Sequence, residues 1–112
     1  MTRFPCPYLV GDVELTVERW DHIRLGHPEF DAESLDRLAR TLTDPDEVRS
    51  DSRFSGTRLF SRWFDDLLGG KIVVVAVVTE ESSGAVPRKR HWAVTAYVTR
   101  RITQGVIEWS RP

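Results

Sequence analysis

The sequence has only one cysteine, Cys6, among its 112 residues, which excludes a disulfide within the chain. A chain without disulfides is typical of a reducing compartment, and we expect a cytoplasmic protein. The longest apolar run, residues 72–78, is far shorter than the ~20 residues that a membrane helix requires. The N-terminus has no apolar segment followed by a cleavage site, so we expect no secretory signal and no membrane partner.

The chain also lacks the short motifs that mark several common chemistries. It has no HExxH helix, no paired CxxC, no glycine-rich phosphate loop and no GxSxG elbow. His22, His27 and Glu29 are metal-ligating types, but no further cluster completes such a site, so we expect neither a metal nor a cofactor. Cys6 lies between two prolines without a neighbouring base, which favours a packed residue over a nucleophile.

A surplus of positive charge is missing as well. Seventeen acidic residues nearly balance sixteen basic ones, giving a net charge of −1, which argues against a uniformly basic nucleic-acid binder. The charges are unevenly distributed, however, because residues 83–106 contain no Asp or Glu but five basic residues: Arg88, Lys89, Arg90, Arg100 and Arg101. A basic face opposite an acidic one and a solvated basic loop both remain open.

Two helices are predicted in the first half of the chain, which we interpret as one domain, 1–112, with an N-terminal extension at 1–12. The first helix follows Thr16, a suitable N-cap, and ends at Gly26. The second has Asp31 as its expected N-cap and ends near Pro45. Its apolar residues follow the spacing of an amphipathic stripe: Leu35, Leu38, Ala39 and Leu42.

The second half favours strands, at 47–52, 57–64, 71–78 and 90–100, with a last short strand near residue 106. Hairpin-like connections predict antiparallel pairing, so the fold class is α+β, with two N-terminal helices packed on one face of a four-stranded antiparallel sheet. Alternation along 90–100 predicts two rows of side chains. We expect Trp92, Val94, Ala96 and Val98 to face the helices and Thr95, Tyr97 and Thr99 to face away.

Histidines supply the first candidate chemistry, because histidine exchanges protons near neutral pH. His22 shares a polar face of the first helix with Arg19, three residues earlier. His27 lies beyond Gly26, so helical spacing does not predict its direction, and it remains open whether it is only a turn residue. His91 follows a basic loop, and we expect it at the surface.

Basic residues on the strands supply the second candidate chemistry. Arg58 and Arg62 are four residues apart and share a face of their strand, and Lys71 opens the next one. Together with Thr95, Tyr97 and Thr99 they would suit a phosphate group. The alternative is that these cations form surface ion pairs with nearby carboxylates: Asp65, Asp66 and Glu108.

In order along the chain, the segments LTVERWDHIRLGHPEF, TLTDPDEV, KIVVVAVV, WAVTAYVTRR and VIEW resemble the small phage and bacterial nuclease-like domains of the barnase–EndoU–colicin–RelE (BECR) group. The resemblance covers residues 14–109 and implies the same two helices on a four-stranded antiparallel sheet. It also implies metal-independent RNA cleavage by a toxin that a protein antitoxin neutralises. The polar residues that match its motifs are His22, His27, Glu29, Thr95, Tyr97 and Thr99.

These features favour a metal-independent endoribonuclease of the toxin type, in which a ribose 2′-OH attacks the adjacent phosphate and leaves a 2′,3′-cyclic phosphate. The expected partners are RNA and a protein antitoxin. The candidate catalytic residues are His22, His27, Arg62 and Tyr97. The candidate substrate-binding residues are Arg19, Arg58, Lys71, Thr95 and Thr99. The rival interpretation is a non-catalytic domain of the same fold that binds protein or RNA on its open sheet face.

Overall fold

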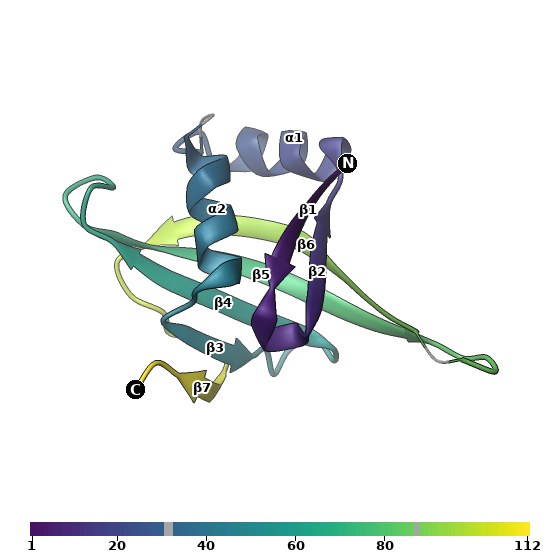
Figure 1. The fold of residues 1–112 in the computed structure, drawn as a ribbon. Helices are drawn as coiled ribbons and strands as arrows, with labels where there is room; N and C mark the ends of the chain where they lie inside the picture. The colour runs from purple at the N-terminus through teal and green to yellow at the C-terminus, as the bar shows by residue number, and fades with distance from the viewer. Residues whose placement is uncertain (31–32, 87) are drawn as a thin grey trace.

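A seven-stranded mixed sheet carries two helices on one of its faces (Figure 1). The structure, a computed structural model, describes residues 1–30, 33–86 and 88–112. The strands pair in the order β1-β2-β6-β5-β4-β3-β7. In chain order the elements are β1 (Thr2–Cys6), the 3₁₀ turn η1 (Pro7–Leu9), β2 (Gly11–Leu15), α1 (Val17–Gly26), α2 (Ser34–Thr43), β3 (Glu47–Ser50), β4 (Thr57–Phe64), β5 (Lys71–Ser82), β6 (Arg88–Thr99) and β7 (Val106–Ser110).

The expected four-stranded antiparallel sheet is wrong, because the sheet has seven strands and one parallel pair. Residues that we interpreted as an N-terminal extension form the β1–β2 hairpin, and β2 joins β6 in parallel through Val13 and His91. The sequence did not indicate β1 because proline is unfavourable in strands, although Phe4 and Cys6 alternate inward with Pro5 facing outward. Proline is tolerated at this position because β1 is an edge strand, where the ladder does not require every N–H.

The two helices begin and end for local reasons. Thr16 caps α1, its hydroxyl accepting the backbone N–H of Arg19 at 3.1 Å, which confirms the predicted start. The first helical residue of α2 is Ser34, and the expected cap Asp31 lies outside the described residues. The apolar stripe of α2 is confirmed, since Leu38 and Leu42 are fully buried against the sheet.

One extra residue in β6 determines which side chains face the helices. Ala76 of β5 pairs with Thr95, whereas the next residue, Val77, pairs with Ala93, so Val94 is a β-bulge. On the N-terminal side of the bulge the alternation is reversed from the expected one. Ala93 is buried in the core under the helices, together with Ala96 and Val98 as expected. The predicted placement of Val94 is wrong, because Val94 packs in the cluster on the opposite face.

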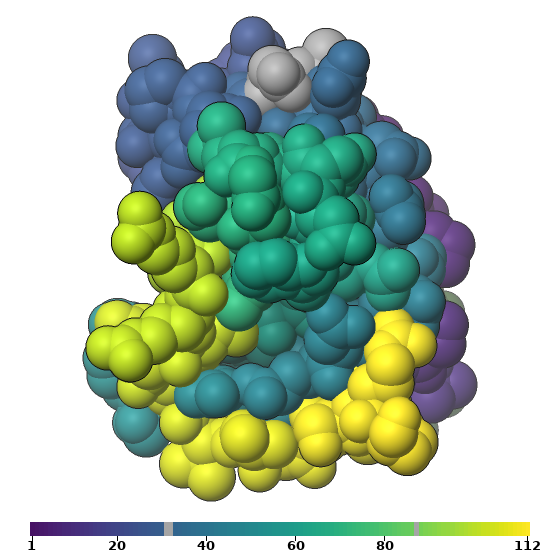
Figure 2. Space-filling view, turned by 90° about the vertical axis from the view of Figure 1, so that its left-hand side faces the viewer, coloured from purple at the N-terminus to yellow at the C-terminus, as the bar shows by residue number. Residues whose placement is uncertain are grey.

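That opposite face, which we call the open face, has its own small apolar cluster of Leu59, Val74 and Ala76. The chain crosses it between β6 and β7, because these strands lie on different sides of β5, β4 and β3 in the sheet. We call residues 100–105 the crossing segment; its Ile102 packs on the cluster. In the space-filling view the yellow-green residues that follow β6 stand beside a hollow (Figure 2).

The β1–β2 hairpin offers a test of the corrected fold. Val13 is fully buried in the core, whereas Val10 in the connection is 93% exposed. Val13→Ala should lower the free energy of unfolding by roughly 2 kcal/mol, because it removes two buried carbons and leaves a cavity. Val10→Ala is the matched control and should cause no loss. Urea denaturation measures both; equal stability of the two variants would contradict the place of the hairpin in the core.

Candidate functional site

The structure brings together two motifs that lie 70 residues apart in the chain, HPEF and TAYVT. The ring centroids of His27 and Tyr97 are 6.2 Å apart, with 35° between the ring planes. His27 is the residue that ends α1, and its backbone N–H donates to the carbonyl of Ile23. The connection after α1 therefore places the imidazole of His27 beside β6. On that strand Tyr97 points to the open face.

Tyr97 lines a hollow of about 460 Å³ on the open face, which we call the open-face cleft. Its floor is apolar and comes from the central strands, with Leu59, Ala76 and Val94. Its polar side chains come from β6, from the start of β4 and from the connection between β3 and β4: Asp51, Arg53, Ser55, Thr57, Thr95 and Tyr97. A mostly apolar hollow with a few convergent polar groups is the usual form of a ligand site.

Arg53 is the cleft residue that the sequence analysis missed. Its Nε and Nη2 donate to the two carboxylate oxygens of Asp51 at 3.1 and 3.0 Å, and Nη2 also donates to Oε1 of Gln104 at 2.8 Å. Among the described residues Nη1 has no acceptor, so its two N–H groups stay available. The side chain is 54% exposed, although its orientation is fixed by both contacts.

Ionisation in the cleft follows from these contacts. The Arg53 guanidinium, helped by the backbone N–H of Arg53, holds the pKa of the buried Asp51 carboxyl below its usual range. Burial raises the pKa of Tyr97. The charges of Arg53 and Asp51 have smaller effects on this pKa, Arg53 lowering it and Asp51 raising it. At neutral pH Tyr97 is therefore a hydroxyl that can donate a hydrogen bond, and no acceptor for it lies among the described residues.

The other predicted site residues lie elsewhere. Arg58 and Arg62 share a face of β4 with the buried Phe60, which is the face toward the helices. Arg58 pairs with Glu108 at 3.1 Å, the alternative that the sequence had left open. Arg62 pairs with Asp44 at 3.0 Å rather than with a carboxylate expected from the sequence.

The remaining candidates do not join the cleft either. His22 and Arg19 are exposed on α1, and among the described residues no side-chain contact links them to Tyr97. The Lys71 ammonium donates to the carbonyls of Leu68 and Gly70. The Thr99 hydroxyl donates to the carbonyl of Arg101. Of the predicted residues, Thr95 and Tyr97 line the cleft, and His27 lies against the ring of Tyr97 without lining the cleft itself.

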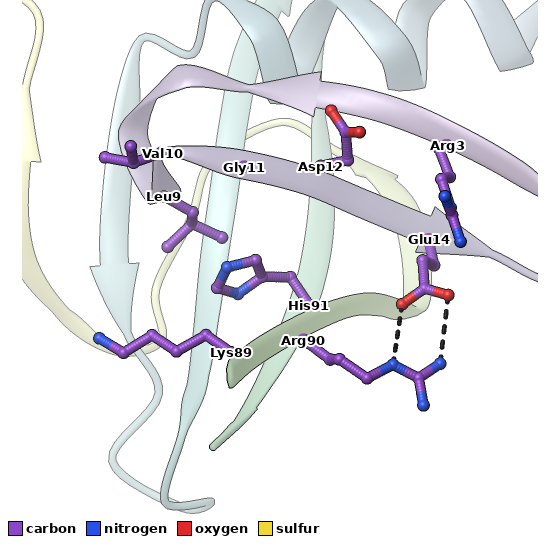
Figure 3. Close-up of a pocket in the computed structure, with 9 residues that line it drawn as sticks. All are labelled: Arg3, Leu9, Val10, Gly11, Asp12, Glu14, Lys89, Arg90 and His91. Atoms are coloured by element: carbon purple, nitrogen blue, oxygen red, sulfur yellow. Dashed lines mark hydrogen bonds and ion pairs between the residues drawn. The ribbon is translucent and has the colours of Figure 1, made fainter. Parts of the chain in front are cut away.

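A second hollow, of about 510 Å³, lies beside the β1–β2 hairpin and contains His91 (Figure 3). The prediction that His91 lies at the surface is wrong, because it is 5% exposed and packs beside Gly11. Its Nδ1 is 2.8 Å from the hydroxyl of Thr79. Burial lowers the pKa of His91, and the charges of Arg58 and Lys89 act in the same direction. His91 is thus a neutral packing residue where β2 joins β6.

Comparison with known proteins adds no assignment, because no protein-family model, no curated protein and no solved structure matches the chain. Within the described ranges, no helix has the length and apolar character needed to cross a membrane. The same residues contain no group of three His, Cys, Asp or Glu side chains that could hold a metal ion. Function is therefore inferred from the geometry of the cleft.

The buried imidazole predicts how stability depends on pH. Because the pKa of His91 is lower in the folded protein than its ordinary value of 6.5, the unfolded chain takes up the proton first as the pH falls. The contribution of neutral His91 to stability is fully present above about pH 6.5 and is lost as the pH falls toward the folded-state pKa.

His91→Asn tests this, since asparagine can still bond to Thr79 but does not titrate. Urea unfolding at about pH 7.5 and about pH 5.5 should show a smaller pH-dependent loss for the variant than for the parent. The exposed His22→Asn serves as the matched control and should lose as much stability between the two pH values as the parent does. An equal pH-dependent loss in His91→Asn and in the parent would contradict the buried neutral imidazole.

Proposed function

We propose that the protein is a metal-independent ribonuclease that binds single-stranded RNA in the open-face cleft and cleaves it by attack of a ribose 2′-OH on the neighbouring phosphate. The observation that supports this most is that His27 lies against the ring of Tyr97, while Tyr97 lines a cleft that also carries the oriented guanidinium of Arg53. These three groups supply a proton-transfer residue, a neutral donor and a fixed positive charge. Such groups can accelerate RNA cleavage by transesterification without a metal.

Arg53 would stabilise the charge that develops on the phosphate. Asp51 and Gln104 hold its Nε and Nη2, which leaves the two N–H groups of Nη1 for phosphate oxygens. Such an arrangement needs little reorganisation when charge appears, and this is the feature of a preorganised electrostatic site. Tyr97, protonated at neutral pH, would donate a further hydrogen bond to the same phosphate.

His27 would act as the base. Its Nδ1 lies 3.4 Å from a carboxylate oxygen of Glu29, which orients the ring, and the side chain is partly exposed, so that substrate can reach it. In the proposed reaction His27 removes the 2′-OH proton and the 2′-oxygen bonds to phosphorus. The bond from phosphorus to the 5′-oxygen breaks, and water supplies the proton to that leaving group. The product is a 2′,3′-cyclic phosphate.

The resemblance to the BECR nuclease domains agrees with this chemistry, although the sheet differs from the one that it implied. As part of the proposal, we expect a toxin of the cytoplasm with a protein antitoxin as its partner. A second candidate function is RNA binding without cleavage, which the exposed Phe54 at the cleft favours. Arg53 lies 5.5 Å over its ring, and an exposed aromatic ring beside a guanidinium can stack with a base.

Paired histidine variants test the catalytic assignment. His27→Asn should reduce the cleavage rate of single-stranded RNA by roughly 10²–10⁴-fold in the presence of EDTA, the usual loss when a proton-transfer group is removed. The comparison variant is His22→Asn, the other histidine of the motif. A large loss in His22→Asn together with full activity in His27→Asn would show that the reaction does not use the open-face cleft.

Arg53→Lys tests the oriented guanidinium, because it keeps the charge but loses the fork. We expect roughly 10²–10³-fold slower cleavage, as for the loss of one donor to a developing negative charge. Arg100→Lys is the matched control, since Arg100 is exposed and has no partner among the described residues. If the purified parent bound RNA without cleaving it, and Arg53→Lys weakened binding alone, the non-catalytic function would be the correct one.

A further inference from the structure

Besides the cleft, the open face has another hollow, which lies on the other side of the crossing segment. It measures about 310 Å³ and is lined by Ser61 and Trp63 of β4, by Arg49 of β3, and by Arg101 and Ile102 of the crossing segment. We call it the Trp63 hollow. The space-filling view shows this end of the molecule hollowed between the yellow-green residues after β6 and the green turn between β4 and β5 (Figure 2).

Trp63 forms one wall of this hollow and is 46% exposed. Its ring is nevertheless fixed, because the indole N–H donates to the carboxylate of Asp65. The ring also lies against Gly70, where a Cβ would come within 2.5 Å of Cζ2, so no other residue fits at that position without displacing the ring. A large apolar ring that is held rigid and left half in water is suited to stacking against another flat group.

Three arginines line the hollow together with Trp63, and its two carboxylates, Asp46 and Glu47, are already engaged. Asp46 accepts the backbone N–H of Trp63 and the side chain of Arg111, while Glu47 accepts from Arg49. Arg62, which also lines the hollow, pairs with Asp44. The guanidinium of Arg101 is exposed and has no hydrogen-bond or ion-pair partner among the described residues. The free charge of the hollow is therefore positive and comes from Arg101.

The two hollows are connected through one residue of the crossing segment. The backbone carbonyl of Gln104 accepts Nη1 of Arg49 at 3.2 Å, and its side-chain oxygen accepts Nη2 of Arg53 at 2.8 Å. Arg49 lines the Trp63 hollow and Arg53 lines the open-face cleft. A strand of nucleic acid that crosses Gln104 would thus meet positively charged groups on both sides.

We propose that the Trp63 hollow is a second nucleotide subsite of the same RNA strand, in which a base stacks on Trp63 and its phosphate pairs with Arg101. This rests on the proposed function, since it assigns the RNA that the open-face cleft would hold. Stacking on an exposed aromatic residue is tolerant of base identity, so the subsite adds affinity for longer strands rather than sequence specificity.

Binding of 2′-O-methyl oligonucleotides tests the subsite separately from cleavage, because they have no free 2′-OH to attack. Fluorescence anisotropy with labelled single strands of two and six nucleotides should show tighter binding of the longer strand by the parent. Trp63→Ala should weaken binding of the six-nucleotide strand by roughly 10- to 100-fold, the usual effect of one lost stacking contact. Trp63→Phe, which keeps an aromatic ring, should retain most of the affinity.

Trp109→Ala is the matched control, because Trp109 is a partly exposed tryptophan of β7 that packs against the core under the helices and lines neither hollow, so it should leave this affinity unchanged. Arg101→Ala removes an exposed side chain without a partner, so it does not threaten folding, and it should weaken binding of the six-nucleotide strand. If Trp63→Ala bound the six-nucleotide strand as tightly as the parent, the subsite would be overturned. If Trp63→Ala failed to fold, the same result in Arg101→Ala would overturn it. Cleavage of RNA by the parent with no effect of these variants would refute the subsite alone, whereas their expected effect without any cleavage would refute only the ribonuclease.

Discussion

The single extra residue in β6 determines how this central strand divides its side chains between the core under the helices and the open face. Without the bulge at Val94, strict alternation would place Trp92 and Ala96 on the same face, as the sequence suggested. With the bulge, the strand has Ala93 under the helices and still presents Thr95 and Tyr97 to the open face. Bulges are common beside functional sites because they redirect a side chain without breaking the sheet.

The crossing segment is the second constraint, and it follows from the topology. Because β7 pairs with β3 and not with β6, the chain must pass over the open face, and its Ile102 covers part of the apolar cluster there. The segment also supplies Gln104, which fixes two arginines. A face that would otherwise be a flat sheet is thereby divided into two hollows, each with an oriented guanidinium.

Local signals in the sequence predicted the helices well, and long-range pairing was not predictable. The Thr16 cap and the Leu38–Leu42 stripe depend on neighbouring residues, which the sequence displays directly. The parallel contact of β2 with β6 joins residues nearly 80 positions apart, and Pro5 in the TRFPC segment argues against a strand there. Arg53 was missed because its role depends on Asp51 and Gln104, although the short D-x-R spacing in the β3–β4 connection was a visible signal.

The near-zero net charge determines how such a site would find RNA. With sixteen basic and seventeen acidic residues, the protein has little long-range attraction for a polyanion. Several arginines away from the open face are neutralised in pairs, such as Arg58 with Glu108 and Arg62 with Asp44. The open face differs, because the guanidinium of Arg101 has no hydrogen-bond or ion-pair partner among the described residues and Arg53 has free N–H groups. Recognition would therefore depend on short-range contacts in the two hollows, and its affinity would depend less on salt than that of a uniformly basic binder.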